Sequence, residues 1–127
     1  MSPVGKRVLL IEDEDHIRLL VSVILRRKGY VVQEASDGLQ ALALLRDAPA
    51  FDLFITDLQM PGLGGISLIM EMRTRFPNVP IVVISAYATA DWAKDALENA
   101  VIALPKPFSH ADLIRVVDDA FQPPVSL

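Results

Sequence analysis

The sequence predicts an α/β protein, a doubly wound parallel sheet of five strands with helices on both faces. Short apolar runs alternate with longer amphipathic stretches along the whole chain, which is the pattern of strands and covering helices. The apolar runs end abruptly at polar residues, as strands buried on both faces do. A length of 127 residues with 52% hydrophobic residues suits one domain with a full core.

The first strand is expected over residues 8–11, which are all apolar and stop at the acidic run 12–15. A helix follows, and its apolar residues fall on one face: Ile17, Leu20, Val21, Ile24 and Leu25. Basic residues 26–28 suit the negative end of its dipole. Gly29 then ends this helix.

Residues 30–35 include the β-branched pair Val31 and Val32 and predict the second strand. Asp37-Gly38 is a turn into a helix that ends near Pro49. The apolar residues of this helix are Leu39, Leu42 and Leu45. The third strand covers residues 53–56 and finishes at Asp57.

Pro and Gly are too frequent in residues 60–65 for regular structure, so a loop is expected there. The helix after it has apolar positions at Ile66, Ile69, Met70 and Phe76. The fourth strand covers residues 81–84 and ends at Ser85. The next helix has a weak face of small residues and is expected to be the loosest: Ala90, Ala93, Ala96 and Leu97.

The fifth strand is expected over residues 101–104, followed by a turn at Lys106-Pro107. Ser109 and Asp112 resemble a capping box at the start of the last helix. The apolar face of that helix is Leu113, Val116, Val117, Ala120 and Phe121. We expect one domain over residues 1–122 and a short tail or cut linker over residues 123–127.

Composition excludes several classes of function. The chain has no Cys, so disulfides and thiolate metal sites are excluded. A net charge of −4, from 12 basic and 16 acidic residues, argues against direct binding of nucleic acid. No long apolar stretch indicates a signal peptide or a membrane span, so we expect a cytoplasmic protein with no membrane partner.

Polar residues at the strand ends should meet on one rim of a doubly wound sheet. Glu12 and Asp13 follow the first strand, and Asp57 ends the third. Three crowded carboxylates repel one another unless a cation lies among them, and oxygen ligands favour Mg²⁺. The alternative is that residues 12–15 are a solvated charge run that complements a helix dipole.

Ser85 and Lys106 come to the same rim from the fourth and fifth strands. Pro107 restricts the backbone of Lys106 and so directs its ammonium group. An ammonium, a hydroxyl and a metal ion together make a phosphoryl site, because they neutralise or bind phosphoryl oxygens. Asp57 would be the nucleophile, since aspartate forms covalent bonds to phosphorus in enzymes.

The chain resembles the receiver domain of two-component response regulators over nearly its whole length. The motifs that carry the resemblance occur in the order typical of that family: Glu12-Asp13, Asp57-Leu58-Gln59-Met60-Pro61 with Gly65, Ser85-Ala86, and Lys106-Pro107-Phe108. The resemblance implies a flavodoxin-like fold with strand order 2-1-3-4-5. It also implies phosphorylation of Asp57 by a sensor histidine kinase or histidine phosphotransfer protein, without turnover of an external substrate.

The resemblance implies a role for each site residue. Asp13, Asp57 and the backbone carbonyl of Gln59 would bind Mg²⁺ directly, and Glu12 would act mainly through water. Ser85 and Lys106 would hold the phosphoryl group. The family also implies a cis Lys106–Pro107 peptide bond, a downstream protein or missing effector domain as the output partner, and room for a phosphorylation-dependent dimer.

Two departures from the family pattern concern the output. Ala103 stands where the family usually has an aromatic residue that changes rotamer on activation. The segment 99–102 is about one residue shorter than usual. We therefore expect the response to pass through Tyr87, or through the small-residue helix that carries Trp92, with Ala103 leaving a shallow pocket for a partner side chain.

Three other functions compete with this interpretation. A haloacid dehalogenase-type enzyme needs an acid two residues after its nucleophile, but that position is Gln59. A flavodoxin needs a phosphate cradle after the first strand, where residues 12–15 would repel a flavin phosphate. An interaction module that works without phosphorylation stays open, because Ala103 favours it while the complete site argues against it.

Overall fold

A computed structural model describes residues 4–47, 50–57, 65–86 and 102–121. The strands are β1 (Arg7–Ile11), β2 (Val31–Ala35), β3 (Leu53–Asp57), β4 (Ile81–Ser85) and β5 (Ile102–Pro105). The described helices are α1 (Asp15–Arg27), α2 (Gly38–Asp47), α3 (Gly65–Arg75) and α5 (His110–Ala120). The helix expected around residues 90–97 lies outside the described residues.

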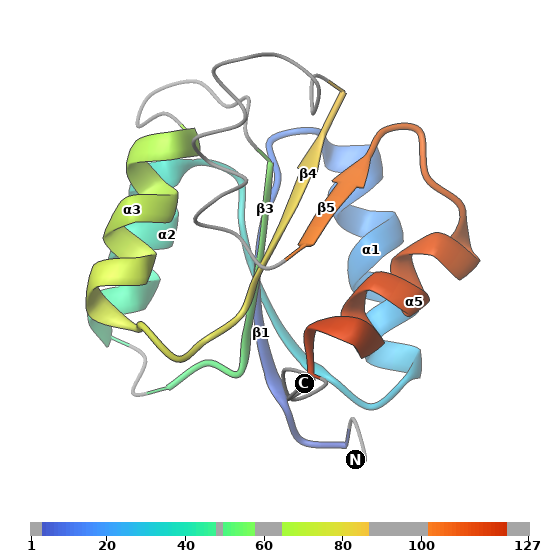
Figure 1. The fold of residues 1–127 in the computed structure, drawn as a ribbon, viewed down its shortest axis with the longest axis horizontal. Helices are drawn as coiled ribbons and strands as arrows, with labels where there is room; N and C mark the ends of the chain where they lie inside the picture. The colour runs from blue at the N-terminus through green and yellow to red at the C-terminus, as the bar shows by residue number, and fades with distance from the viewer. Residues whose placement is uncertain (1–3, 48–49, 58–64, 87–101, 122–127) are drawn as a thin grey trace, which may run out of the picture.

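The strands form one parallel sheet in the order β2-β1-β3-β4-β5. Helices α2 and α3 cover one face of this sheet, and α1 and α5 cover the other (Figure 1). The predicted doubly wound architecture and strand order are confirmed. Because all strands are parallel, their carboxyl ends lie along one edge, at the top of Figure 1.

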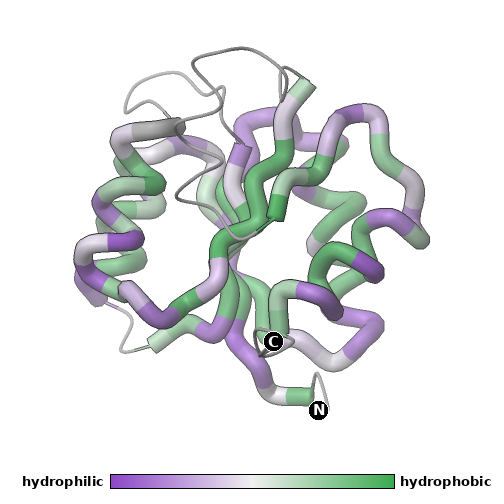
Figure 2. The backbone as a smooth tube through the Cα atoms, viewed as in Figure 1, coloured by the Kyte–Doolittle hydropathy of each residue, from purple (hydrophilic) through white to green (hydrophobic). Residues whose placement is uncertain are grey.

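Alternation along the strands divides the core between the two faces. In β1, Val8 and Leu10 pack with α1 and α5, whereas Leu9 and Ile11 pack with α2 and α3. All four side chains are fully buried. Figure 2 shows the same division as apolar strands between helices that are apolar on their inner sides. The central strands are therefore anchored from both faces.

Three predicted core positions are wrong. Leu20 of α1, Leu39 of α2 and Met70 of α3 are 51%, 68% and 56% exposed. In α2, for example, Ala41 is fully buried while Leu39 is not, so the side of the helix that packs on the core is narrower than the run of apolar residues. Gly65, predicted in a loop, begins α3. Helical periodicity locates a face but does not set its width.

The helix ends follow the predicted capping chemistry. The N–H of Tyr30 donates to the carbonyl of Leu25 and that of Gly29 to the carbonyl of Arg26, which is the Schellman motif with Gly29 at a φ of 103°. At α5 the capping box between Ser109 and Asp112 is confirmed. Among the described residues, no helix is both long enough and apolar enough to cross a membrane.

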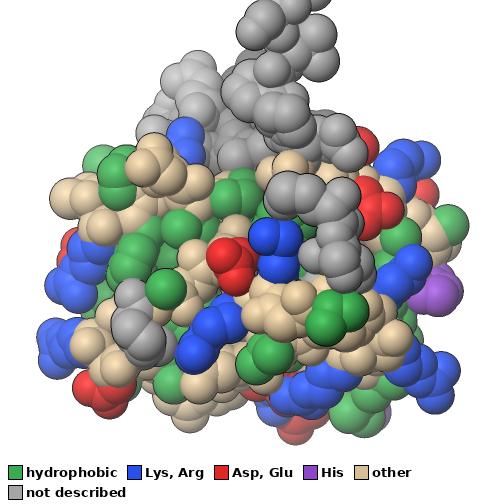
Figure 3. All heavy atoms as spheres, turned by 90° about the horizontal axis from the view of Figure 1, so that it is seen from below, with side chains coloured by type: hydrophobic (Ala, Val, Ile, Leu, Met, Phe, Trp, Pro, Cys, Tyr) green, Lys and Arg blue, Asp and Glu red, His purple; other side chains and the backbone are tan. Residues whose placement is uncertain are grey.

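Basic residues lie at the ends of three helices. The last turns of α1, α2 and α3 carry Arg26 and Arg27, Arg46, and Arg73 and Arg75. These ends lie opposite the carboxyl edge of the sheet, and Figure 3 views them from below, with Lys and Arg side chains around the margin. Each cation complements the negative end of a helix dipole.

Replacing Gly29 by Ala should destabilise the fold. Its positive φ disfavours a side chain, and a Cβ atom would lie 3.0 Å from Cγ2 and 3.3 Å from the backbone Cα of Val4. We expect urea denaturation to show a loss of about 1–3 kcal/mol in the free energy of unfolding.

Gly5→Ala is the matched control, because Gly5 has a φ of 81° but nothing within 4 Å of an added Cβ. It should cost less than Gly29→Ala. Equal losses would show that the contact with Val4 has no effect.

Candidate functional site

Three carboxylates meet at the carboxyl edge of the sheet, as predicted. Glu12 and Asp13 follow β1, and Asp57 is the last residue of the adjacent strand β3. One carboxylate oxygen from each lies within 4.8 Å of the others. Glu12 is fully buried and Asp57 is 4% exposed. The three acidic side chains are therefore crowded together, and two of them are removed from water.

Lys106 brings the compensating charge from the end of β5. Its Nζ donates a hydrogen bond of 2.7 Å to Oδ2 of Asp57 and lies 3.1 Å from Oε1 of Glu12. A third acid, Glu14, is more distant, at 3.8 Å. The lysine side chain is 15% exposed, so it is directed inward and is not a solvated surface lysine. The predicted cis bond to Pro107 is present.

Ser85 reaches the same edge through sheet register. Asp57 pairs with Ile84, so Ser85 follows one residue beyond the end of β3 on the neighbouring strand. The N–H of Lys106 donates to the carbonyl of Ser85 at 3.1 Å, which ties the lysine backbone to the end of β4. Ser85 is 1% exposed. Pairing of the strands therefore brings Ser85 and Lys106 to the carboxyl edge of the sheet, beside the three acids.

The electrostatics of the cluster show in two pKa values. Burial raises the pKa of Glu12 to about 7; the Glu14 N–H that donates to its carboxylate opposes this, and the charge of Asp57 adds to it. For Lys106, burial lowers the pKa, but its contacts with Asp57 and Glu12 raise it more, and the net shift is upward. The ammonium group is therefore held charged while the acids compete for compensation.

The donor set fits a hard cation. Within the described residues no donor makes a hydrogen bond to Oε1 of Glu12, a buried oxygen, although the lysine lies at ion-pair distance. Its ammonium partner is shared with Asp57, so this buried oxygen is only partly compensated. All-oxygen carboxylate ligands of this kind favour Mg²⁺. Gln59, whose carbonyl is the further ligand implied by the resemblance, lies outside the described residues.

The alternative interpretation of residues 12–15 as a solvated charge run holds for the second half of this segment. Glu14 and Asp15 are exposed, and Asp15 pairs with Arg18 at 2.6 Å at the start of α1. Arg18 was missed by the sequence analysis. It also donates to the backbone carbonyl of Glu12 at 2.8 Å and so positions the acidic loop. The signal for this role is its place as the first Lys or Arg after four acids.

An apolar cavity of about 350 Å³ lies beside Lys106. Its walls include Ile17 and Leu20 of α1 and Pro107 and Phe108 after β5. Leu20, which is exposed and does not pack in the core, lines this cavity. The site is thus bordered by a surface suited to apolar side chains of another molecule.

Of the predicted output residues that lie away from the phosphoryl site, the structure describes one. Ala103 is half-buried in β5 and pairs with Val83 of β4. Tyr87 and Trp92 lie outside the described residues.

Comparison with known proteins gives a consistent result. Residues 8–118 match the family model described as the response regulator receiver domain. A sensor kinase of Brucella abortus, CckA, is 33% identical over 91% of this chain, which spans 12% of that protein. The regulatory protein AtoC of Escherichia coli is 32% identical over 91% of this chain, which spans 25% of it. The chain is therefore much shorter than these curated relatives.

Solved structures agree with the fold. The chemotaxis response regulator CheY4 of Vibrio cholerae has a TM-score of 0.85 at 28% identity, covering 93% of this chain and 100% of that one. The response regulator protein TrrA of Thermotoga maritima, in complex with Mg²⁺-BeF, has a TM-score of 0.80 at 29% identity, covering 91% and 99%.

Stability without metal should depend on pH through Glu12. Its pKa is about 7 in the folded chain, against 4.5 for an unperturbed glutamate carboxyl, so the folded chain binds more protons between these pH values. The free energy of unfolding should therefore fall as pH rises from 4.5 to 7, by on the order of 2 kcal/mol, and then level off.

Glu12→Gln should remove this slope and be more stable than the wild type at pH 7. Urea denaturation in EDTA at several pH values measures both. The same slope in the variant would assign the titration to another group.

Proposed function

The chain belongs to the family of response regulator receiver domains, and on that premise we propose that Asp57 accepts a phosphoryl group from a phosphohistidine donor in a Mg²⁺-dependent reaction. Phosphorylation would switch the interaction with a downstream partner. The observation that carries the proposal is the 2.7 Å contact of Lys106 with a buried carboxylate that ends a central strand. This arrangement places the ammonium of Lys106 beside a carboxylate oxygen of Asp57 at the carboxyl edge of the sheet.

In the proposed step, a carboxylate oxygen of Asp57 attacks the phosphorus atom of the donor. An oxygen–phosphorus bond forms, the nitrogen–phosphorus bond breaks, and the imidazole nitrogen leaves with the bonding electron pair. Lys106 would then neutralise phosphoryl oxygens, and the hydroxyl of Ser85 would donate a hydrogen bond to one of them. Both groups already lie at this edge, so little reorganisation is needed.

Asp13, Asp57 and the backbone carbonyl of Gln59 would hold Mg²⁺ directly, and Glu12 would act mainly through water. When bound, the ion neutralises charge that accumulates on the transferring group. Before binding, the carboxylates repel one another, and the ammonium of Lys106 leaves them undercompensated. Relief of the repulsion between these carboxylates would therefore favour binding of a cation at this site.

The donor would be a sensor histidine kinase or a histidine phosphotransfer protein. The apolar cavity beside Lys106 supports a protein donor, because Leu20 and Phe108 offer contacts that a small phosphate ester would not use. We further propose a cytoplasmic location, where such donors carry their phosphohistidine. The output partner would be another protein or an effector domain, not nucleic acid, as the net charge of −4 suggests.

The output route is proposed to differ from the aromatic switch of the family. At Ala103 a methyl group has no rotamer to change, so movement of Ser85 would have to pass to Tyr87 or to the segment with Trp92. The module that works without phosphorylation is less well supported, because the buried acids, the lysine and the serine meet as phosphorylation requires.

Incubation with acetyl phosphate and Mg²⁺ should add a single phosphoryl group to the chain, detected as intact mass. The product should be sensitive to hydroxylamine, as an acyl phosphate is. Asp57→Asn should abolish the mass change, because the amide is no nucleophile.

Asp47→Asn is the matched control, since Asp47 is exposed at the end of α2, away from the carboxyl edge. It should be phosphorylated like the wild type. An unchanged wild-type mass, or an Asp57→Asn variant that still gains the group, contradicts the proposal.

Mg²⁺ should raise the thermal midpoint of the wild type. At ten times its Kd the gain is about 1.4 kcal/mol, or about 5 °C. Asp13→Ala should respond much less and, without metal, should melt higher than the wild type because one repelling charge is gone. Differential scanning calorimetry with Asp47→Ala as control measures this. An Asp13→Ala variant that melts lower without metal and gains as much from Mg²⁺ would exclude a shared site.

A further inference from the structure

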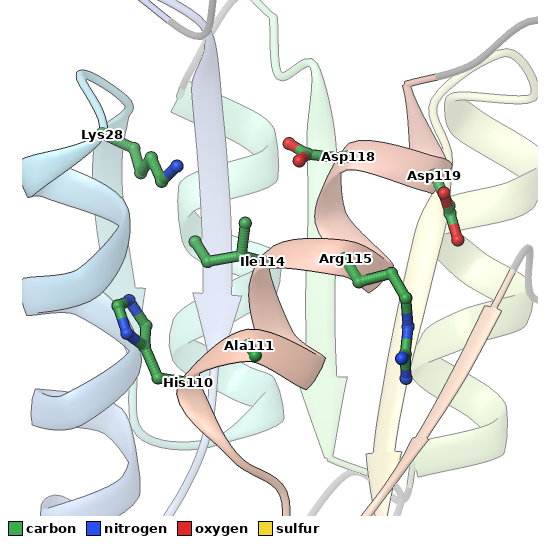
Figure 4. Close-up of a pocket in the computed structure, with 7 residues that line it drawn as sticks. All are labelled: Lys28, His110, Ala111, Ile114, Arg115, Asp118 and Asp119. Atoms are coloured by element: carbon green, nitrogen blue, oxygen red, sulfur yellow. The ribbon is translucent and has the colours of Figure 1, made fainter.

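A second groove lies between α1 and α5, away from the carboxylate cluster, with a volume of about 500 Å³. Figure 4 shows Lys28, just after α1, on one side of this groove and Asp118 of α5 on the other, with Ile114 between them. Arg115 and Asp119 lie on the far side of α5 (Figure 4). The groove therefore has an apolar centre with charges of both signs around it.

The end of α5 departs from the charge pattern of the other described helices. The last turns of α1, α2 and α3 carry Arg, whereas the last turn of α5 has no basic residue. It carries Asp118 and Asp119 instead, at the negative end of the helix dipole. Acids are unfavourable at that position. A cation from outside the helix would relieve them.

Lys28, on the other side of the groove, does not neutralise these acids within the same chain. Among the described residues, neither Lys28 nor Asp118 nor Asp119 forms an ion pair within 4.0 Å. Arg115 is paired with Asp112, at 3.2 Å, on the first half of α5. Within the part of the chain that the structure describes, the groove thus holds an unpaired cation on one side and unpaired acids on the other.

We propose that this groove binds a second copy of the chain, with Lys28 of each copy against the acids at the end of α5 in the other. A two-fold axis parallel to α5 exchanges the two sides of that helix. It therefore brings Lys28 of each copy to the side of α5 where Asp119 of the other copy lies, which makes two equivalent contacts. Such a contact is self-complementary, as an isologous interface must be.

The apolar centre of the groove suits this arrangement. Ile114 is half-buried and would meet its own copy near the axis, and Ala111 is small and exposed enough to let the two α5 helices approach. None of these residues belongs to the carboxylate cluster, so the contact would form with or without phosphorylation. The proposal thus extends beyond the function of Asp57.

Charge reversal tests the proposal without depending on a partner protein. Lys28→Asp puts acid against acid in a homodimer, and Asp119→Lys puts lysine against lysine. Sedimentation equilibrium from micromolar to millimolar concentration at low salt should show wild-type dimers. Each variant should raise the dissociation constant at least ~10-fold, and high salt should weaken the wild-type dimer.

Mixing the two variants is the decisive measurement. In the mixed dimer the aspartate introduced by Lys28→Asp faces the lysine introduced by Asp119→Lys, and at the symmetric contact the native lysine faces the native aspartate. An equimolar mixture should therefore dimerise about as well as the wild type. Asp119→Lys places a cation at a helix C-terminus and should not unfold the chain, which circular dichroism checks. Arg46→Asp, a charge reversal at the end of α2 on the other face of the sheet, should dimerise like the wild type.

A wild type that stays monomeric over the whole range overturns the proposal, and would leave a different, basic partner for the end of α5. Variants that dimerise like the wild type, or a mixture that stays monomeric, overturn it as well.

Discussion

One lysine between two buried carboxylates is the interaction on which the functional edge of this protein depends. Lys106 lies 2.7 Å from Asp57 and 3.1 Å from Glu12, and both acids are at most 4% exposed. Glu12 follows β1 and Asp57 ends the adjacent strand β3, both in the interior of the sheet, and both side chains are shielded from water. Burial is the main cause of the raised pKa of Glu12, and the charge of Asp57 adds to it, while the ammonium of Lys106 opposes it without cancelling it.

Sheet register sets the geometry of that edge. Pairing of Asp57 with Ile84 and of Ser85 with Pro105, extended by the hydrogen bond from Lys106 to Ser85, places the serine and the lysine on successive strands beyond β3. A slip by one residue would turn every core side chain of a strand to the opposite face. The apolar residues on both faces therefore hold the site residues in place, although they never touch a substrate.

The sequence predicted what depends on strand ends and little of what depends on contacts between helices. Asp57, Ser85 and Lys106 were found because each follows an apolar run, and parallel strands bring such residues together. The exposure of Leu20 could not be predicted, because the width of a helix face depends on what covers it. The opposition of Lys28 and Asp118 was equally hidden, since Lys28 follows α1 and Asp118 lies on α5, far apart in the chain.

The acids of the carboxylate cluster and the acids at the end of α5 differ in burial, and burial makes the free-energy cost of their charges unequal. At Glu12 the charge is fully buried, where the effective dielectric constant is low and repulsion is strong. At Asp118 and Asp119 the side chains are exposed, and water and salt screen most of the penalty. A cation that binds among the carboxylates around Glu12 therefore relieves a large free-energy penalty. A contact at the end of α5 relieves a small one, and so can only be weak, salt-sensitive and readily reversed.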